Sequence, residues 1–309
     1  MYQHISGPDQ TNIGIDYAKI SVVPKSGYLG MCVFFNTYEQ LLSQPNNQVE
    51  ITHAHAATSR FGKKHFQIGH IECPQFREHA NPQELALWDA LAYTRSIPWS
   101  MYRERAPYAE FSSQSRLVFI YRNPLDQLVS HYKHCNKLPA DDAADPIDPQ
   151  ALEKFIFEYN ALGAYIKMFY SFHIARQHYA AHILFVPYEE IMQNRAYAMQ
   201  IILRHLALPY DETAFNRALE STSITRLKAE EQLRQSAISG GSGPSRHIRN
   251  GGTGVWQKHM TPQMVQRIEA ELQKFDLSLC MFHLADEFEP QFAFLQPMSS
   301  SNIRARARL

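Results

Sequence analysis

Hydrophobic residues recur with two different periods along this chain. Short apolar runs alternate with longer stretches in which apolar residues return every three or four positions. The first short run ends in I-S-V-V-P-K-S-G (20–27), and residues 28–42 after it predict a helix. Further strands are predicted at 49–54, 66–71, 116–121 and 182–186. Helices are predicted at 126–136, 149–179, 194–206, 211–220 and 262–275.

Strands separated by helices are typical of βαβ units. We therefore expect a single P-loop-like α/β domain over residues 1–296, with a mainly parallel central sheet flanked by helices on both faces. The acidic, proline-punctuated stretch 137–150 and the glycine-rich stretch 236–254 predict mobile loops. Residues 297–309 predict a disordered basic tail.

Composition adds little that is specific. The formal net charge is zero and the pI is about 7.3, so no overall attraction to nucleic acid or membranes follows. The four cysteines are scattered, without the paired spacing of a zinc site or a disulfide framework. No uninterrupted apolar run is long enough to span a bilayer. We expect a soluble, cytoplasmic protein that needs no metal and binds no nucleic acid.

The turn at V-P-K-S-G (23–27) indicates a phosphate site. A strand, a tight turn and a helix N-terminus present backbone N–H groups and the positive end of the helix dipole to an anion, and Lys25 adds a full charge. Gly27 permits close approach of the backbone. No G-x-x-x-x-G-K-[ST] loop is present, which disfavours an ATPase or GTPase. The alternative is an ordinary turn with a solvated lysine.

A second anion signal follows the predicted strand 116–121. Arg122 ends this strand, Asn123 and Pro124 have the positions of an N-cap and a first-turn proline, and Ser130 lies about two turns into the next helix. Arginine and serine so placed are able to hold one phosphate together. Alternatively, Arg122 forms an ion pair with Asp126.

Together these segments resemble a known family. V-P-K-S-G and Y-R-N-P-L-D-Q-L-V-S-H-Y are similar to the two phosphate-binding motifs of the sulfotransferases, whose sulfuryl donor is 3′-phosphoadenosine 5′-phosphosulfate. Three further segments resemble the family in the expected order: V-P-Y-E-E-I-M-Q-N, S-T-S-I-T-R-L-K and I-R-N-G-G-T-G-V-W-Q-K-H-M-T-P. The five matches cover about 240 residues.

The resemblance implies roles for individual residues. The 5′-phosphosulfate would be held by Lys25, Ser26 and Gly27 with the backbone amides of Tyr28 and Leu29. The 3′-phosphate would be held by Arg122, Ser130, Arg249, Asn250 and Gly251. The adenine pocket would be lined by Tyr188, Thr222 and Ser223. A cation cluster at each end suits a nucleotide phosphorylated at both ends.

The chain departs from the family pattern at two places. Tyr28, Leu29 and Gly30 stand where the family usually has two threonines and a tryptophan, so the hydroxyl contacts and the adenine-stacking indole are missing. Asn250 replaces the usual lysine near the 3′-phosphate. These changes affect donor affinity more than donor identity.

Transfer to a hydroxyl acceptor also needs a general base, and histidine is the usual choice. Family order places the base between the two phosphate motifs, which leaves His53, His55, His65 and His70. We favour His70 in G-H-I-E-C-P, with His53 in I-T-H-A-H as the second choice. Either histidine is alternatively a strand residue bonded to the backbone. Lys25 would then stabilise the leaving oxygen.

The leading hypothesis is thus a sulfotransferase that acts on a small-molecule, lipid-like or carbohydrate acceptor and releases adenosine 3′,5′-bisphosphate. A P-loop kinase and a catalytically silent nucleotide-binding protein are the alternatives. The sequence leaves the oligomeric state open, because the dimer motif of cytosolic members has no convincing match around 258–267.

Overall fold

A computed structural model describes most of the predicted domain. The described residues are 17–43, 58–61, 64–69, 73, 76–91, 116–136, 147–229 and 252–282. The predicted strand 49–54, His53, His70, residues 249–251 and the tail 297–309 lie outside them. His65 lies within a described strand by its backbone alone.

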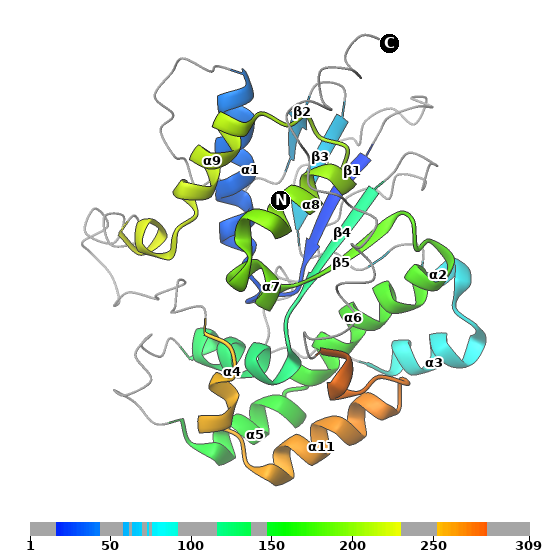
Figure 1. Cartoon of the computed structure of the whole chain (residues 1–309). Coiled ribbons are helices and arrows are strands. Elements are labelled where there is room, and N and C mark those ends of the chain that lie inside the picture. Colours follow the sequence, from blue (N-terminus) through cyan, green and yellow to red (C-terminus); the bar gives the residue numbers. More distant parts are fainter. Residues whose placement is uncertain are drawn as a thin grey trace, which may run out of the picture.

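One sheet organises the fold (Figure 1), with strand order β2-β3-β1-β4-β5. The strands are β1 (Tyr17–Val22), β2 (Thr58–Phe61), β3 (Lys64–Gly69), β4 (Arg116–Tyr121) and β5 (Ile183–Pro187). Strands β3, β1, β4 and β5 run parallel, and only the edge strand β2 is antiparallel among the described strands. The mainly parallel α/β sheet expected from the sequence is confirmed. The predicted strand 66–71 begins two residues earlier, and β2 was not predicted.

The helices follow the strands as expected for a βαβ fold. They are α1 (Tyr28–Ser43), α2 (Phe76–His79), α3 (Pro82–Ala90), α4 (Pro124–Cys135), α5 (Pro149–Phe157), α6 (Ala161–His178), α7 (Tyr188–Gln193), α8 (Arg195–His205), α9 (Glu212–Ser221) and α11 (Pro262–Gln273). Two 3₁₀ turns, η2 (Val255–Lys258) and η3 (Leu279–Phe282), flank α11. No helix in these described ranges is long and apolar enough to cross a membrane.

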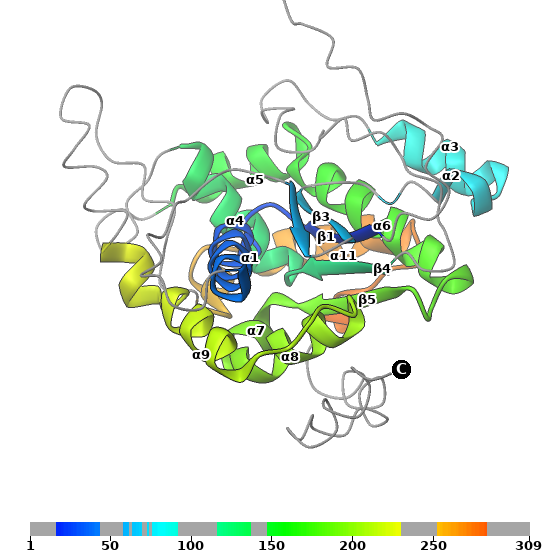
Figure 2. The same ribbon diagram turned by 90° about the horizontal axis from the view of Figure 1, so that it is seen from above.

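Both faces of the sheet are buried, and β4 shows how its sequence achieves this. Leu117 and Phe119 join a core formed with α4, α5, α6 and α11, whereas Val118 and Ile120 join a second core formed with α1, α8 and α9. The alternation follows from the two-residue period of a strand. Viewed along the other axis, α5 and α6 lie on one side of the sheet and α8 and α9 on the other (Figure 2). The continuous apolar run of β4 therefore marks a strand covered on both sides.

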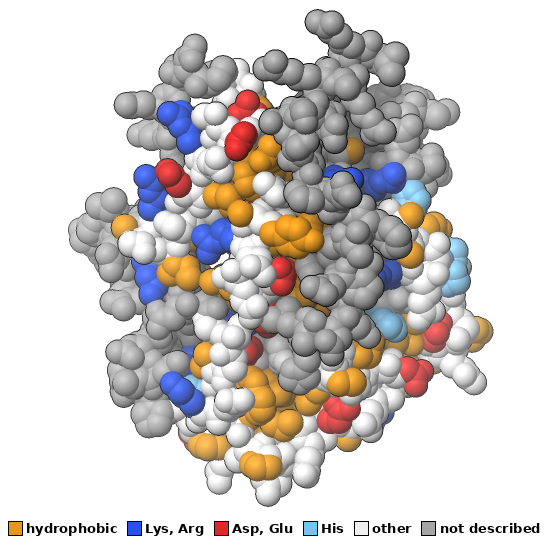
Figure 3. All heavy atoms as spheres, in the orientation of Figure 1, with side chains coloured by type: hydrophobic (Ala, Val, Ile, Leu, Met, Phe, Trp, Pro, Cys, Tyr) orange, Lys and Arg blue, Asp and Glu red, His pale blue; other side chains and the backbone are white. Residues whose placement is uncertain are grey.

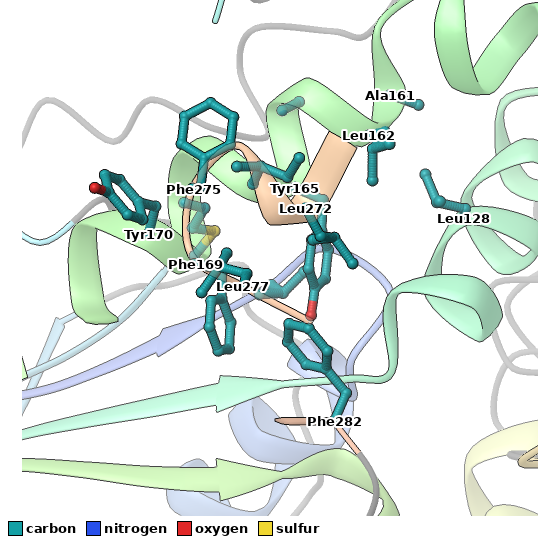
Figure 4. Packing of buried hydrophobic residues seen from close by; sticks show 14 of the residues in the cluster. Leu128, Ala161, Leu162, Tyr165, Phe169, Tyr170, Leu272, Phe275, Leu277 and Phe282 are labelled. Atoms are coloured by element: carbon teal, nitrogen blue, oxygen red, sulfur yellow. The ribbon is translucent and has the colours of Figure 1, made fainter. Parts of the chain in front are cut away.

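Helix α6 is the centre of the first core. Phe169 packs edge-on against Phe282 with ring centroids 4.7 Å apart, and Phe172 stacks on Phe119 of β4 at 4.1 Å. Figure 4 shows Phe275 and Leu277, from the C-terminal segment, beside the α6 side chains. This core packs against one face of β4 and so anchors the residues at the carboxyl end of the strand.

The sequence predicted one long helix over 149–179, and this prediction is wrong. Helix α5 ends at Phe157 and α6 begins at Ala161. Asn160 between them has φ 55°, a left-handed conformation that asparagine tolerates better than most residues. Its side chain fills the space that a Cβ at Gly163 would occupy. The resulting corner allows α5 and α6 to pack against each other, and the apolar periodicity does not reveal it.

Charged side chains of the described residues are spread over one face of the molecule. In Figure 3, basic and acidic side chains of the described residues are interspersed with apolar ones on the face shown. This distribution agrees with a net charge of zero. Strong anion binding must therefore come from a local arrangement of donors.

His205 gives the fold a testable pH dependence. Its Nε2 lies 3.0 Å from the Leu117 carbonyl oxygen and 3.2 Å from that of His182. Burial lowers its pKa to about 4, so the native state does not take up the proton that the unfolded chain binds near pH 6.5. Stability is therefore lost as the pH falls from about 6.5 toward 4, by about 2–3 kcal/mol for this residue.

We expect His205→Gln to lose less stability than the wild type between pH 7 and 4.5, measured by urea unfolding. Glutamine is able to donate a hydrogen bond but does not ionise. His178→Gln is the control, because His178 is exposed on the last turn of α6. Identical pH slopes for wild type and His205→Gln would contradict the assignment.

Candidate functional site

The turn between β1 and α1 forms one wall of the candidate site. Val23 N–H donates to the Ile120 carbonyl oxygen at 2.9 Å, and Ser26 N–H donates back to Val23 at 3.0 Å. Lys25 and Gly27 have φ of 70° and 90°. A positive φ is uncommon for lysine and is characteristic of functional turns. The V-P-K-S-G segment is thus a tight, strained turn.

The start of α4 forms the opposite wall. Asn123 caps the helix by accepting the Leu125 N–H at 2.9 Å, and Pro124 occupies the first helical position. Both roles confirm the prediction from the sequence. Gln127, one turn on, donates to the Pro24 carbonyl oxygen at 3.0 Å. This bond fastens α4 directly to the lysine turn.

Arg122 connects the two walls. Its Nη1 donates to the Lys25 carbonyl oxygen at 3.2 Å and its Nη2 to the Gly252 carbonyl oxygen at 2.8 Å. The guanidinium lies 4.9 Å from the Tyr188 ring centroid, and Tyr165 Oη donates to the Arg122 carbonyl oxygen at 2.6 Å. Although it is only 6% exposed, Arg122 forms no ion pair with a carboxylate of the described residues. Two carbonyl oxygens thus hold its positive charge in place, and within the part of the chain that the structure describes no direct ion pair cancels it.

The site lies where the topology favours ligand binding. From β1 the chain moves to β3 on one side, and the later strands β4 and β5 lie on the other side. The strand order therefore reverses between β1 and β4, and open α/β sheets bind ligands at the carboxyl ends of the strands at such a point. Helices α1, α4 and α7 all begin at this end of the sheet (Figure 1). Lys25 follows β1, and Arg122 follows β4.

The residues after β5 pack against both walls of the site. A Cβ on Gly27 would approach the Tyr188 ring to 3.1 Å, so only glycine fits beneath this ring. Burial raises the pKa of the Tyr188 phenol, and the nearby Arg122 opposes this rise. Glu189 accepts the Asn123 N–H at 3.0 Å, and burial raises the pKa of its carboxyl group. The first turn of α7 thus supports both walls.

Several buried polar atoms here lack a partner within the described protein. They are Ser26 Oγ, Arg122 Nε, Gln127 Oε1 and Glu189 Oε2. Buried polar groups are nearly always hydrogen-bonded, so unpaired ones that gather at one place indicate a ligand or ordered water. Ser26 and Arg122 contribute donors, which fit a phosphate-type anion. The lack of room for a side chain at Gly27 likewise fits an anion that is held by backbone amides.

A third segment closes the site beside α4. Gly252 accepts a bond from Arg122, while Gly254 and Trp256 donate their N–H groups to Asp126. The end of the predicted mobile loop 236–254 is therefore fixed at residues 252–254. The alternative ion pair between Arg122 and Asp126 does not form, because the carboxylate turns toward these amides. Ser130 lies one helical turn after Asp126 on the same face of α4.

Two of the predicted adenine-side residues, Thr222 and Ser223, lie at the C-terminal end of α9. Thr222 caps this helix, its hydroxyl donates to the Leu219 carbonyl oxygen at 2.8 Å, and its own carbonyl oxygen accepts Arg195 Nη1 at 2.7 Å. Ser223 Oγ accepts the Arg226 N–H at 3.3 Å. Tyr188 interacts electrostatically with Arg195. Arg195 therefore links the two parts that the sequence assigned to the adenine pocket.

The structure brings Lys25, Ser26, Gly27, Arg122 and Tyr188 together around one point. The bases His70 and His53, together with Arg249, Asn250 and Gly251, lie outside the described residues. Their predicted roles stay predictions.

Sequence reasoning missed the supporting roles of four residues: Asp126, Gln127, Glu189 and Arg195. The first three act on backbone groups of segments distant in the chain, so no local pattern announces them. A partial signal existed for Asp126 and Gln127, because both lie in the first turn of a helix that starts at a phosphate motif.

The fold and the site define an α/β protein with unpartnered buried donors at its topological switch point. Comparison with known families makes this specific: residues 89–276 match the sulfotransferase domain. The match covers more than half of the chain, and the protein belongs to the sulfotransferase domain family.

Individual relatives are distant. Sulfotransferase 2B1 of Rattus norvegicus is 28% identical over 160 residues, which cover 50% of this chain and 45% of the rat protein. The chain thus spans about half the length of this relative. Cytosolic sulfotransferase 1 of Arabidopsis thaliana is 20% identical over 283 residues, covering 88% of this chain and 81% of that protein.

Among solved structures, a crystal structure of retinol dehydratase in a complex with retinol and PAP has a TM-score of 0.50 and 14% identity. The match covers 89% of this chain and 84% of that one. At this identity the likeness supports the fold.

Proposed function

We propose that this protein transfers a sulfuryl group from 3′-phosphoadenosine 5′-phosphosulfate to an acceptor hydroxyl or amine. The observation that carries the proposal is the position of Arg122. Its guanidinium is held between the carbonyl oxygens of Lys25 and Gly252 and lies at the switch point opposite the K-S-G turn. Two anion sites at the ends of one pocket suit a nucleotide phosphorylated at both ends.

The described residues fit this donor. Ser26 Oγ and Arg122 Nε are buried donors without a partner among the described residues, and Gly27 permits close approach of the backbone. We assign Ser26, Gly27 and the amides of Tyr28 and Leu29 to the 5′-phosphosulfate, and Arg122 and Ser130 to the 3′-phosphate. The retinol dehydratase neighbour carries PAP, which is the product that such a donor leaves behind. We extend this ligand to the present chain.

When bound, the donor supplies the sulfuryl group and a bisphosphate leaving group. The chain's own residues provide in-line positioning and charge stabilisation, which is most of what such a transfer demands. Lys25 stabilises the negative charge that develops on the leaving oxygen. His70, or His53 in its place, accepts the proton of the acceptor hydroxyl. Helix α1 directs its N-terminal dipole at the same anion.

The acceptor class is a small-molecule, lipid-like or carbohydrate alcohol, or an amine. Retinol in the neighbour's complex and the amine sulfotransferase name of a rabbit relative illustrate this range. A cytoplasmic location is also part of the proposal, because several relatives are named cytosolic sulfotransferases.

Calorimetric titration tests the donor class. We expect binding of adenosine 3′,5′-bisphosphate without magnesium and at least tenfold weaker binding of ATP with magnesium. The reason is that Arg122 and Ser130 are assigned to a 3′-phosphate, which ATP lacks, and not to a γ-phosphate. The converse result would favour a P-loop kinase. Turnover of labelled donor with a broad acceptor panel would exclude the catalytically silent alternative.

The two candidate bases are separated by their kinetics. We expect His70→Ala to lose turnover while its affinity for adenosine 3′,5′-bisphosphate stays unchanged, since a base acts on the acceptor. His53→Ala is the matched comparison. Full activity of His70→Ala, with loss in His53→Ala, would reverse the assignment.

A further inference from the structure

One carboxylate fastens the segment 252–256 to helix α4. Asp126 Oδ2 accepts the Gly254 N–H at 2.7 Å, and its Oδ1 accepts the Trp256 N–H at 3.1 Å. Asp126 is 3% exposed and lies in the first turn of α4. Both carboxylate oxygens thus bind backbone amides of the same segment. Hydrogen bonds to a buried charged acceptor are among the stronger ones in proteins.

The same segment fixes Arg122. Gly252, two residues before the first amide held by Asp126, accepts Arg122 Nη2 at 2.8 Å. The other guanidinium nitrogen, Nη1, binds the Lys25 carbonyl oxygen at 3.2 Å. If the segment moved, Arg122 would lose its shorter bond, and the direction of its guanidinium would then depend on the Lys25 carbonyl oxygen and the Tyr188 ring. The orientation of the Arg122 guanidinium therefore depends on Asp126.

The direction of the Asp126 carboxylate also matters for charge. Asp126 lies four residues after Arg122, and a direct ion pair would neutralise the guanidinium that an anion needs. Two neutral amides occupy the carboxylate instead. The charge of Arg122 stays available, while the negative charge of Asp126 is satisfied by N–H groups and by the N-terminal dipole of α4. A buried carboxylate beside an anion site is thereby tolerated.

We propose that Asp126 is a positioning residue for the 3′-phosphate half of the nucleotide. It holds segment 252–256 in the place where Gly252 directs Arg122, and it does not touch the ligand itself. This inference rests on the proposed function and adds a residue through which the 3′-phosphate is discriminated. The 5′ half, held by the K-S-G turn, depends on Asp126 less, because Gln127 also holds that turn through the Pro24 carbonyl oxygen.

Two nucleotides measure this selectivity. Calorimetry on the full chain gives dissociation constants for adenosine 3′,5′-bisphosphate and for adenosine 5′-monophosphate. In Asp126→Asn, one oxygen is replaced by an NH₂ group that faces a backbone N–H. We expect bisphosphate binding to weaken by about tenfold or more and monophosphate binding by less than about threefold. The ratio between the two constants therefore falls.

A matched variant controls for the general loss of an acidic residue at the N-terminus of a helix. Asp148 caps α5 by accepting the Gln150 N–H at 3.0 Å. Asp148→Asn is expected to leave both constants unchanged. If Asp126→Asn weakened binding of both nucleotides equally, the ratio of the two dissociation constants would stay unchanged. This result would show a structural role only and overturn the proposal. Failure of the wild type to bind either nucleotide would instead overturn the proposed function, and this inference with it.

Hydrogen exchange on the wild type keeps the test valid if Asp126→Asn does not fold. Nucleotide binding and the fixed position of segment 252–256 are linked, because each favours the other. The bisphosphate should therefore slow exchange of the Gly254 and Trp256 amides at least threefold more than the monophosphate at equal saturation. Equal protection by the two nucleotides would contradict the proposal.

Discussion

Arg122→Lys is expected to weaken binding of adenosine 3′,5′-bisphosphate by roughly 30- to 1000-fold, or about 2–4 kcal/mol. Lysine keeps the charge but is a single point donor on a flexible stem. The three N–H groups of lysine share one nitrogen, so they cannot reach the carbonyl oxygens of Lys25 and Gly252 and a ligand from separate positions, as Arg122 does with Nη1, Nη2 and Nε. Calorimetry at fixed ionic strength measures the change.

The same strand offers the control. Arg116 lies at the opposite end of β4, where its Nη1 lies 2.8 Å from His182 Nδ1. Arg116→Lys changes the same type of residue on the same strand, far from the switch point, and should alter nucleotide affinity less than about threefold. Similar losses in both variants would indicate a general effect on β4. An unchanged affinity in Arg122→Lys would remove Arg122 from the site.

How much of this could be predicted from the sequence depends on the range of the interaction. Asn123 and Pro124 are local signals, and the structure confirms the helix start that they predict. The run 116–121 predicted β4 with its observed bounds, because a strand covered on both faces leaves a continuous apolar pattern. The switch point required the strand order, and no pattern within one segment gives that order.

The failures have an equally physical cause. The corner at Asn160 depends on one backbone dihedral, and the apolar periodicity continues across it. Asp126 binds amides 128 and 130 residues away, so the sequence suggested only its near neighbour Arg122 as a partner. Long-range bonds from a side chain to the backbone leave no spacing to read. They make up most of what holds this site together.

Strain and close packing meet at the K-S-G turn, where the site is least tolerant of change. Lys25 and Gly27 both have positive φ, and Arg122 and Gln127 hold the carbonyl oxygens of Lys25 and Pro24. A strained turn persists only when its surroundings fix it. The turn is therefore preformed, which lowers the entropy cost of binding an anion.

Gly27→Ala should accordingly destabilise the protein by about 2–4 kcal/mol and weaken bisphosphate binding at least about 100-fold. Alanine at φ 90° is strained, and its Cβ would lie 3.1 and 3.2 Å from two atoms of the Tyr188 ring. That ring cannot yield freely because the guanidinium of Arg122 lies on it. The turn must then open, and the backbone amides lose their common direction. Urea unfolding and calorimetry measure the two effects.

Gly30→Ala separates this cause from the general loss of a glycine. Gly30 lies in the first turn of α1, and a Cβ there would meet nothing within 4 Å. Because alanine favours helices by about 1 kcal/mol over glycine, this variant should be slightly stabilised and should bind the nucleotide normally. If Gly27→Ala behaved in the same way, the turn would not be a preformed anion site. The contrast between two glycines three residues apart thus tests whether backbone geometry, in addition to the charge of Lys25, forms the donor site.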